Sequence, residues 1–412
     1  MGYSSLIFLA LVFACVQSKW ATPIEITSYI DPIKISKTIY TDPSSGVSHI
    51  AYCNSSDGAL YYAHLDDTGL FLTGPTALTT EQRCYHAEIT GPGDGLNVYL
   101  TLEARRTMSV DECTPENPSS CDDFYVFEST DGGQTWQQPK VAGGASGDIV
   151  RRRTYKLLTN WKTKYFWMMY TRSEPKDSGI AIARYNTETH KFDKDHMLVS
   201  KFAGLSQYPL LTFNEKGETN IQLVYATPYT LTLQTFVSTD LGETWKKGEP
   251  MKGVCAGPKM VIRTLLSKGK YLVAGCTKAE VLHFSFSEDN GKTWTVPALY
   301  PQKNVEEVSF CSRKETTSPL IDMLVLFRDK KNLFMAHSPV PALDGKVIDV
   351  PDAFYFAAYK MDINCYYRND ELKVRFMYHV RTPLEGASKY TMYVIDNDNI
   401  VDTPKREIKA DL

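Results

Sequence analysis

Short stretches in which apolar and polar residues alternate recur along the whole chain, with turn-forming residues between them about every 8 to 12 positions. No stretch has a convincing helical period of apolar residues. In the middle of the chain the alternation predicts two sets of three strands, at Tyr208–Phe213, Asn220–Ala226, Leu231–Ser238, Lys259–Leu265, Lys270–Cys276 and Val281–Ser287. We therefore expect an all-β protein built from repeats of antiparallel strands.

One eight-residue sequence follows three of the predicted strands with little change, at Ser129–Trp136, Ser238–Trp245 and Ser287–Trp294. All three copies keep a serine, an aspartate, a glycine, a threonine and a tryptophan at the same positions. The aspartates Asp131, Asp240 and Asp289 can accept hydrogen bonds from the amides of their own turn, and the glycine two positions later can adopt positive φ. We expect Trp136, Trp245 and Trp294 to be largely buried between the strands of their own repeat.

This turn resembles the Asp-box (BNR repeat) of sialidases and related β-propellers. The resemblance implies a folding device at the periphery of each blade, so a structural role for the three aspartates is favoured over a catalytic one. Weaker copies extend the series to box positions near residues 65, 129, 184, 238, 287, 338 and 395. Seven repeats of four strands predict a seven-bladed β-propeller, in which radial closure leaves few exposed sheet edges. A six-bladed propeller, as in the sialidase family, is the alternative.

The first 18 residues have the features of a secretory signal peptide, which leaves residues 19–412 as a single propeller domain of a secreted protein. We predict no transmembrane segment. The mature chain has eight cysteines, an even number that suits an oxidising compartment. The asparagine of the sequon Asn54-Ser55-Ser56 is a predicted glycosylation site. The expected disulfides are Cys113–Cys121, Cys255–Cys276, Cys53–Cys84 and Cys311–Cys365.

Polar residues near the start of the predicted inner strands are the candidates for a ligand site, because loops at one face of a propeller commonly form it. Such a site mixes acidic, basic and aromatic side chains, as carbohydrate binding requires. The candidate ligand-binding residues are His86, Glu88, Arg152, Tyr208 and Glu307. If the protein is a hydrolase, Glu88 and Glu307 are the candidate carboxylate pair.

Sialidase chemistry itself is not expected. The family has its first substrate-binding arginine in an Arg-Ile-Pro motif, whereas the matching place here reads Ile30-Asp31-Pro32. The first hypothesis is therefore a secreted, sialidase-like propeller that binds a glycan or protein ligand without the sialidase catalytic residues. A glycoside hydrolase with a carboxylate pair at the channel mouth is the alternative, and an adhesive or structural component is a third.

The charge pattern gives no reason to expect a nucleic-acid partner. The net charge is −3, and the basic residues are scattered apart from Arg151-Arg152-Arg153. The cysteine spacings do not match zinc-binding motifs, and no dinucleotide or phosphate-loop motif occurs. We therefore expect no metal and no cofactor, and the oligomeric state stays open.

Overall fold

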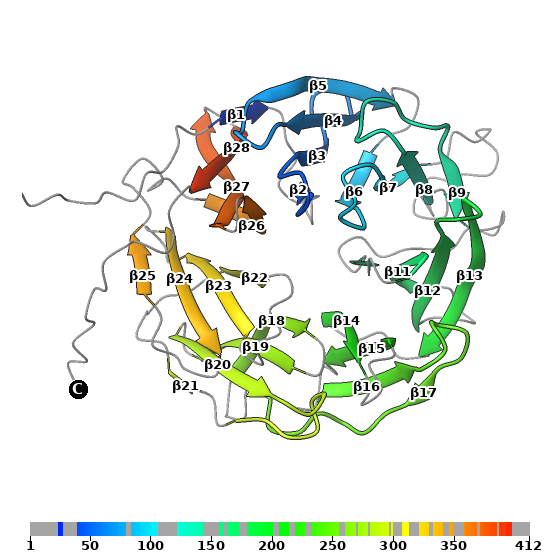
Figure 1. The fold of residues 1–412 in the computed structure, drawn as a ribbon, viewed down its shortest axis with the longest axis vertical. Coiled ribbons are helices and arrows are strands. Elements are labelled where there is room, and N and C mark those ends of the chain that lie inside the picture. Colours follow the sequence, from blue (N-terminus) through cyan, green and yellow to red (C-terminus); the bar gives the residue numbers. More distant parts are fainter. Residues whose placement is uncertain are drawn as a thin grey trace, which may run out of the picture.

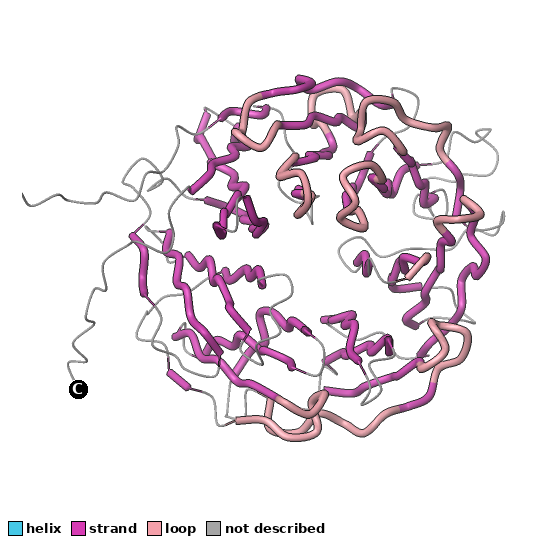
Figure 2. The backbone as a smooth tube through the Cα atoms, in the orientation of Figure 1, coloured by secondary structure: helices cyan, strands magenta, loops and turns pink. Residues whose placement is uncertain are grey.

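Every regular element in the described part of the chain is a β-strand, and the strands form small sheets arranged in a ring (Figure 1). Figure 2 shows strands and loops but no helix among these residues. The prediction of an all-β chain is confirmed. The computed structural model describes residues 24–27, 39–79, 84–105, 122–142, 156–159, 163–172, 179–200, 206–213, 219–226, 233–254, 260–268, 271–278, 281–295, 298–299, 307–312, 321–328, 333–340, 346–349, 358–368, 371–384 and 387–397.

The first four sheets each take four consecutive strands, paired antiparallel in chain order. Sheet 1 contains β2 (Ile39–Thr41), β3 (Ser48–Cys53), β4 (Leu60–Leu65) and β5 (Phe71–Thr79). Sheet 2 contains β6 (Cys84–Thr90), β7 (Val98–Arg105), β8 (Asp122–Ser129) and β9 (Lys140–Ala142). Sheet 3 contains β10 (Lys156–Thr159), β11 (Tyr165–Arg172), β12 (Gly179–Asn186) and β13 (Lys191–Ser200). Sheet 4 contains β14 (Ser206–Phe213), β15 (Thr219–Ala226), β16 (Leu233–Ser238) and β17 (Lys246–Lys247).

The remaining strands form three more sheets, the last of which joins both ends of the described chain. Sheet 5 contains β18 (Met260–Lys268), β19 (Tyr271–Lys278), β20 (Val281–Ser287) and β21 (Ala298–Leu299). Sheet 6 contains β22 (Glu307–Ser312), β23 (Ile321–Arg328), β24 (Leu333–Val340) and β25 (Lys346–Asp349). Sheet 7 contains β26 (Ala358–Arg368), β27 (Glu371–Leu384), β28 (Ala387–Asn397) and β1 (Ile24–Thr27).

The first strand of each sheet lies nearest the centre of the ring and the fourth lies at the periphery (Figure 1). The innermost strands β2, β6, β10, β14, β18, β22 and β26 contact one another in this order, and β26 contacts β2. In sheet 7 the outermost strand is β1, which pairs antiparallel with β28. Strand β1, from the beginning of the chain, is therefore the fourth strand of the sheet whose other three strands come from the end of the chain. All seven predicted box positions fall within the third strand of a sheet.

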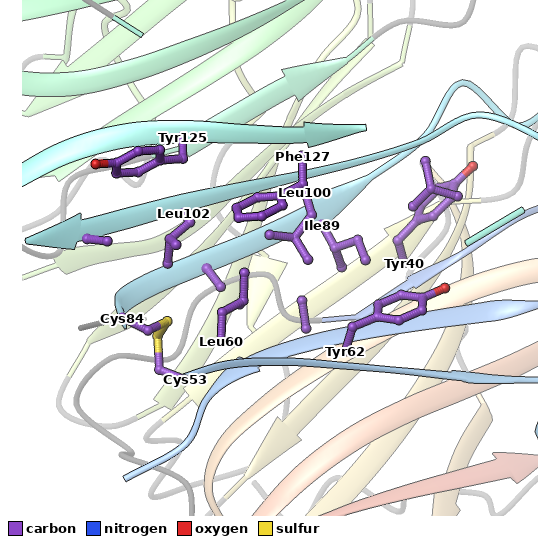
Figure 3. Packing of buried hydrophobic residues seen from close by; sticks show 14 residues of the cluster. Tyr40, Cys53, Leu60, Tyr62, Cys84, Ile89, Leu100, Leu102, Tyr125 and Phe127 are labelled. Atoms are coloured by element: carbon purple, nitrogen blue, oxygen red, sulfur yellow. A yellow bond between two sulfur atoms is a disulfide. The ribbon is translucent and has the colours of Figure 1, made fainter. Parts of the chain in front are cut away.

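The hydrophobic core is divided among the interfaces between neighbouring sheets. Between sheets 1 and 2, Leu60 and Tyr62 pack against Leu100 and Phe127, and Figure 3 shows these side chains between the two sets of strands. Similar buried clusters fill the interfaces of sheet 7 with sheet 1, sheet 2 with sheet 3, sheet 3 with sheet 4, and sheet 4 with sheet 5. Both faces of a sheet are thus buried, which explains why β4 and β12 read as nearly continuous apolar runs.

The Asp-box turn has the hydrogen bonds that its sequence predicts. The Oδ1 atom of Asp131 accepts from the amide of Thr135 at 2.9 Å, and its Oδ2 atom accepts from the Thr135 hydroxyl at 2.6 Å. The amide of Gly133, a residue with φ of 84°, donates to the Ser129 hydroxyl at 2.8 Å. The turns at Asp240 and Asp289 repeat this pattern. The motif is therefore a self-contained turn.

Each box turn also packs against the sheet that precedes its own. A Cβ atom added at Gly133 would collide with the Tyr62 hydroxyl of sheet 1, and one at Gly242 would press against Trp167 of sheet 3. Trp167 and Arg184 of sheet 3 both donate to the carbonyl oxygen of Leu241, at 3.1 and 2.9 Å. The box therefore holds neighbouring sheets together as well as closing a hairpin.

The prediction for the box tryptophans needs correction. Trp136, Trp245 and Trp294 are only partly buried, and each packs against the core between its own sheet and the preceding sheet. Trp136, for example, meets Tyr62 of sheet 1 edge to face, with ring centroids 4.8 Å apart. The reason is geometric: the tryptophan leaves the turn at the periphery, where the wedge between two radial sheets is widest.

We predict that Gly133→Ala lowers the free energy of unfolding by about 1 to 3 kcal/mol, because the added methyl group overpacks the contact with Tyr62 at a residue of positive φ. Gly74→Ala is the control, since no atom lies within 4 Å of the added Cβ. Denaturant unfolding of both variants measures the difference. Equal stability of the two variants would contradict the packing role given to the box glycine.

Candidate functional site

The candidate site lies where the innermost strand of sheet 2 meets sheet 3. On β6, Ala87 and Ile89 belong to the core shared with sheet 1. Because side chains alternate along a strand, His86 and Glu88 lie on the opposite face of β6, toward sheet 3. Both are buried, with exposed fractions of 6 % and 1 %. The strand thus presents an imidazole and a carboxylate to the interface with sheet 3.

Glu88 links the two sheets directly. The backbone amide of Leu157, on β10 of sheet 3, donates to the Oε2 atom of Glu88 at 2.8 Å. The other carboxylate oxygen, Oε1, lies 3.5 Å from Nε2 of His86. On the sheet 2 side, the Thr101 hydroxyl donates to the carbonyl oxygen of Glu88 at 3.3 Å. Glu88 is therefore fixed from both sheets.

A second buried carboxylate, Glu103 of β7, joins this cluster and was missed by the sequence reasoning. Glu103 lies directly opposite His86 in the antiparallel ladder of β6 and β7, and its exposed fraction is 1 %. In the sequence it stands between Leu102 and Ala104, so a charged side chain interrupts an apolar run. That signal marks the residue as unusual, but the register that places it beside His86 follows only from the structure.

The sequence-predicted ligand residues are spread over several sheets. Tyr208 lies on β14, the innermost strand of sheet 4, and Glu307 is the first residue of β22, the innermost strand of sheet 6. The side chains of both, and Arg152 altogether, lie outside the described residues. Ile30-Asp31-Pro32 also lies outside them. Of the five predicted residues, the described structure brings together His86 and Glu88.

The predicted carboxylate pair, Glu88 with Glu307, comes from two sheets that are not neighbours in the ring. Their strands β6 and β22 belong to sheets 2 and 6, which do not adjoin in the ring (Figure 1). Glycosidases need the two carboxyl groups within about 5 to 10 Å of each other. Glu88 moreover points to sheet 3 and bonds an amide there. Because the side chain of Glu307 lies outside the described residues, the acid and base pair of Glu88 and Glu307 stays a prediction.

The box aspartates are electrostatically satisfied. Hydrogen bonds from the side chain and amide of Thr135 lower the pKa of Asp131 to about 2. Burial alone would raise the pKa of Asp240 and Asp289, but the hydrogen bonds of Thr244 and Thr293 lower it below its ordinary value. Carboxylates held ionised by the amides and hydroxyls of their own turn are poor proton donors near neutral pH.

The remaining sequence-predicted sites lie near the ends of the strands. Cys53 of sheet 1 and Cys84 of sheet 2 form the expected disulfide (Figure 3). Cys276 is also disulfide-bonded. Its expected partner Cys255 and the predicted pair Cys113–Cys121 lie outside the described residues, as do the side chains of Cys311 and Cys365.

The sequon asparagine Asn54 follows β3 in the turn to β4. The amide and hydroxyl of Ser56 both donate to its Oδ1 atom, at 2.9 and 2.8 Å, and its side chain is largely buried. A glycan on its Nδ2 atom would have to leave a closely packed turn. Glycosylation of Asn54 stays a prediction.

Two further observations concern metal ligands and membrane spans in the described ranges. Within them, no three histidine, cysteine, aspartate or glutamate side chains gather closely enough to hold a metal ion. No helix among these residues is long and apolar enough to cross a membrane. The titratable groups described at this interface are the pair of His86 and Glu88, with Glu103 opposite His86 in the ladder.

Comparison with known proteins identifies the repeat. Residues 127–138 match the family model of the BNR/Asp-box repeat. No curated protein matches the sequence.

Solved structures of similar fold have low sequence identity to this chain. The polysaccharide lyase Uly1 is similar with a TM-score of 0.50 at 9% identity, over 94% of this chain and 94% of that chain. The NanB sialidase of Streptococcus pneumoniae has a TM-score of 0.43 at 11% identity, over 85% and 83% of the two chains. The six-bladed lectin of Aleuria aurantia has a TM-score of 0.40 at 11% identity, over 72% and 91%. Of these three likenesses, the one to Uly1 is close enough to support the fold, and it supports the fold alone. The matched repeat and the two further copies of its turn identify Asp-box (BNR) repeats in this chain, and their sheets are arranged in a sialidase-like propeller fold.

Proposed function

We propose that this protein is a secreted, seven-bladed Asp-box propeller that binds a glycan at the end of the ring where the innermost strands begin, without sialidase catalysis. The observation that carries the proposal is the hydrogen bonding of the Glu88 carboxylate. Glu88 is 1 % exposed, and its carboxylate accepts a hydrogen bond from the Leu157 amide of the next sheet. A carboxylate so engaged supports a pre-formed binding wall better than it supports an acid catalyst.

The blade count in this proposal rests on the repeats. Seven four-stranded sheets, innermost strands in contact around the ring, and a last sheet completed by β1 all support seven blades. The secreted location rests on the signal-like residues 1–18. The Cys53–Cys84 disulfide is in keeping with export, because disulfides persist in oxidising compartments.

The proposed ligand is a glycan, with acidic polysaccharides the first class to examine. Three consecutive arginines, Arg151 to Arg153, precede β10 in the sequence, and guanidinium groups bind carboxylates and sulfates bidentately. His86 and the aromatic Tyr208 stand on innermost strands of sheets 2 and 4. Guanidinium and aromatic side chains suit hydrogen bonding and ring stacking with sugars.

A glycan array that carries acidic and neutral oligosaccharides tests the proposal. We expect retention of at least one glycan class, and loss of that retention in Arg152→Ala and Tyr208→Ala. Lys164→Ala is the control, because Lys164 lies in the turn before β11 and pairs at 3.1 Å with the exposed Glu188. No retention of any glycan, or equal retention by all three variants, would refute the proposed site.

A further inference from the structure

The innermost strands leave one edge open toward the centre of the ring. Each pairs with the second strand of its own sheet on one side, so backbone groups on the other side need partners from elsewhere. Side chains supply such partners at two places. Glu88 of β6 accepts from the Leu157 amide of β10, and Asn364 of β26 donates to the Ile39 carbonyl oxygen of β2 at 3.1 Å. In both, a side chain binds the backbone of the next innermost strand around the ring.

The bond at β10 has a charged acceptor, whereas the bond at β2 joins two neutral groups, and both strands are short. Strand β10 has only four residues, and its ladder with β11 runs from Lys156–Met169 to Thr159–Phe166. So short a ladder gives few hydrogen bonds with which to fix the strand. A buried bond to a charged acceptor is among the stronger hydrogen bonds in proteins, so the contact with Glu88 contributes a large share of what holds Leu157.

The acceptor is itself held rigidly. Cys84, at the start of β6, is joined to Cys53 of sheet 1 by the disulfide, and both cysteines are buried. The Thr101 hydroxyl binds the backbone of Glu88 from β7. The disulfide to sheet 1 and the ladder of sheet 2 therefore fix the position of Glu88. The carboxylate of Glu88 in turn fixes the position of β10.

We propose that Glu88 is a positioning residue: its carboxylate fixes the start of β10 against β6, and so sets the wall of the binding mouth between sheets 2 and 3. The inference rests on the proposed function for its role in binding. Glu88 acts through Leu157 and does not touch the ligand, since its Oε2 atom is occupied by the amide and its side chain is 1 % exposed. This role differs from the ligand-binding or catalytic role that the sequence predicts for it.

Two substitutions at Glu88 separate the positioning role from mere loss of a charge. Glu88→Met removes the acceptor and keeps the length of the side chain. Glu88→Gln removes the charge and keeps an oxygen that can accept from Leu157. Asn364→Leu is the matched control, because it removes the equivalent contact at β2, in the interface of sheets 7 and 1. Hydrogen exchange of the backbone amides of residues 156–159 is measured in the full-length protein.

We expect Glu88→Met to speed exchange in 156–159 by about tenfold or more, as loss of one such bond implies. Glu88→Gln should restore most of the protection, and Asn364→Leu should leave this segment unchanged. Equal exchange in Glu88→Met and the unaltered protein would overturn the proposal. So would an equal effect of Asn364→Leu on 156–159, because it would show general loosening of the ring.

If Glu88→Met does not fold, replacing the Leu157 amide by an ester removes the donor and leaves Glu88 intact. Faster exchange at the neighbouring amides is then expected, and unchanged exchange overturns the proposal. Binding of polygalacturonate, an acidic polysaccharide, is measured in parallel. We expect Glu88→Met to weaken it about tenfold and Glu88→Gln to restore it. If the unaltered protein binds neither this probe nor an array glycan, the proposed function fails, while the exchange result still decides the role of Glu88.

Discussion

Arg375→Met is expected to lower the free energy of unfolding by about 3 to 5 kcal/mol, the largest single effect that we predict. Arg375 lies on β27 with an exposed fraction of 0 %, and its Nε and Nη2 atoms donate to Asp396 at 2.5 and 2.6 Å. Its Nη1 atom donates to the Ser48 hydroxyl at 2.7 Å and to the Asp66 carbonyl oxygen at 3.0 Å. The guanidinium group therefore joins sheet 7, which contains both ends of the described chain, to sheet 1.

The size of the effect follows from what the substitution leaves behind. Methionine fills much of the space but leaves the buried carboxylate of Asp396 without its partner, and an uncompensated buried charge is costly. Denaturant unfolding at neutral pH measures the loss. Lys164→Met is the control, since its pair with Glu188 is exposed to solvent, where ion pairs contribute little to stability.

A double replacement separates the charge from the packing. Changing Arg375 to Met together with Asp396→Leu removes both charges, so we expect this protein to regain part of the stability lost in Arg375→Met. A loss in Arg375→Met no larger than that in Lys164→Met would show that the ring does not depend on this contact.

Lowering the pH from 7.0 to 4.5 is expected to cost about 2.5 kcal/mol of stability through His49 alone. Burial, and next the neighbouring His64, lower the pKa of His49 to about 3, from 6.5 in an unfolded chain. His49 lies on β3, where its Nδ1 atom is 2.7 Å from the Tyr62 hydroxyl. Tyr40 stacks on the ring, and the carboxylate of Asp42 opposes the lowering.

The sign follows from proton uptake. His49 stays neutral in the fold, so below about pH 6.5 the unfolded chain binds a proton that the folded chain does not. Stability is therefore complete above this pH and is lost as the pH falls toward 3. Unfolding curves for the unaltered protein and His49→Gln at both pH values measure the contribution. His64, whose pKa burial also lowers, acts in the same direction in both proteins and cancels from the comparison. An identical pH dependence of the two proteins would contradict the assignment to His49.

Local features of the fold could be predicted from the sequence because their hydrogen bonds lie within a few residues. The Asp131 carboxylate bonds Thr135, four positions away, so eight residues suffice to specify the turn. The turn at Asp66, a weaker copy, likewise keeps the bonds from Thr68 and Leu70. Strand limits in sheets 4 and 5 agree with the alternation of apolar residues to within a few positions.

Contacts between sheets could not be predicted in the same way, because they depend on how the sheets are set around the ring. Glu88 and Leu157 are 69 positions apart, and Arg375 and Ser48 are 327 apart. Nothing in the sequence near Glu88 shows that its carboxylate bonds β10, or that Glu103 stands opposite His86. The contacts of the box tryptophans with the preceding sheet also depend on how the sheets are set around the ring, so the sequence alone does not show them. The Cys53–Cys84 disulfide could be predicted, because the two cysteines lie in consecutive repeats and the chain has few cysteines to pair.

The central claim is that this sialidase-like propeller binds a glycan and does not hydrolyse sialosides. Turnover of a fluorogenic sialoside by the purified protein tests it most directly. Where the sialidase family has its first arginine, Ile30, Asp31 and Pro32 stand in the sequence, so a sialic acid would lose a bidentate partner for its carboxylate. Such a contact is worth roughly 1.5 to 3 kcal/mol. We predict no fluorophore release above the rate without protein, under conditions in which array binding is seen. Efficient release that a single change at His86, Arg152, Tyr208 or Glu307 abolishes would contradict the account.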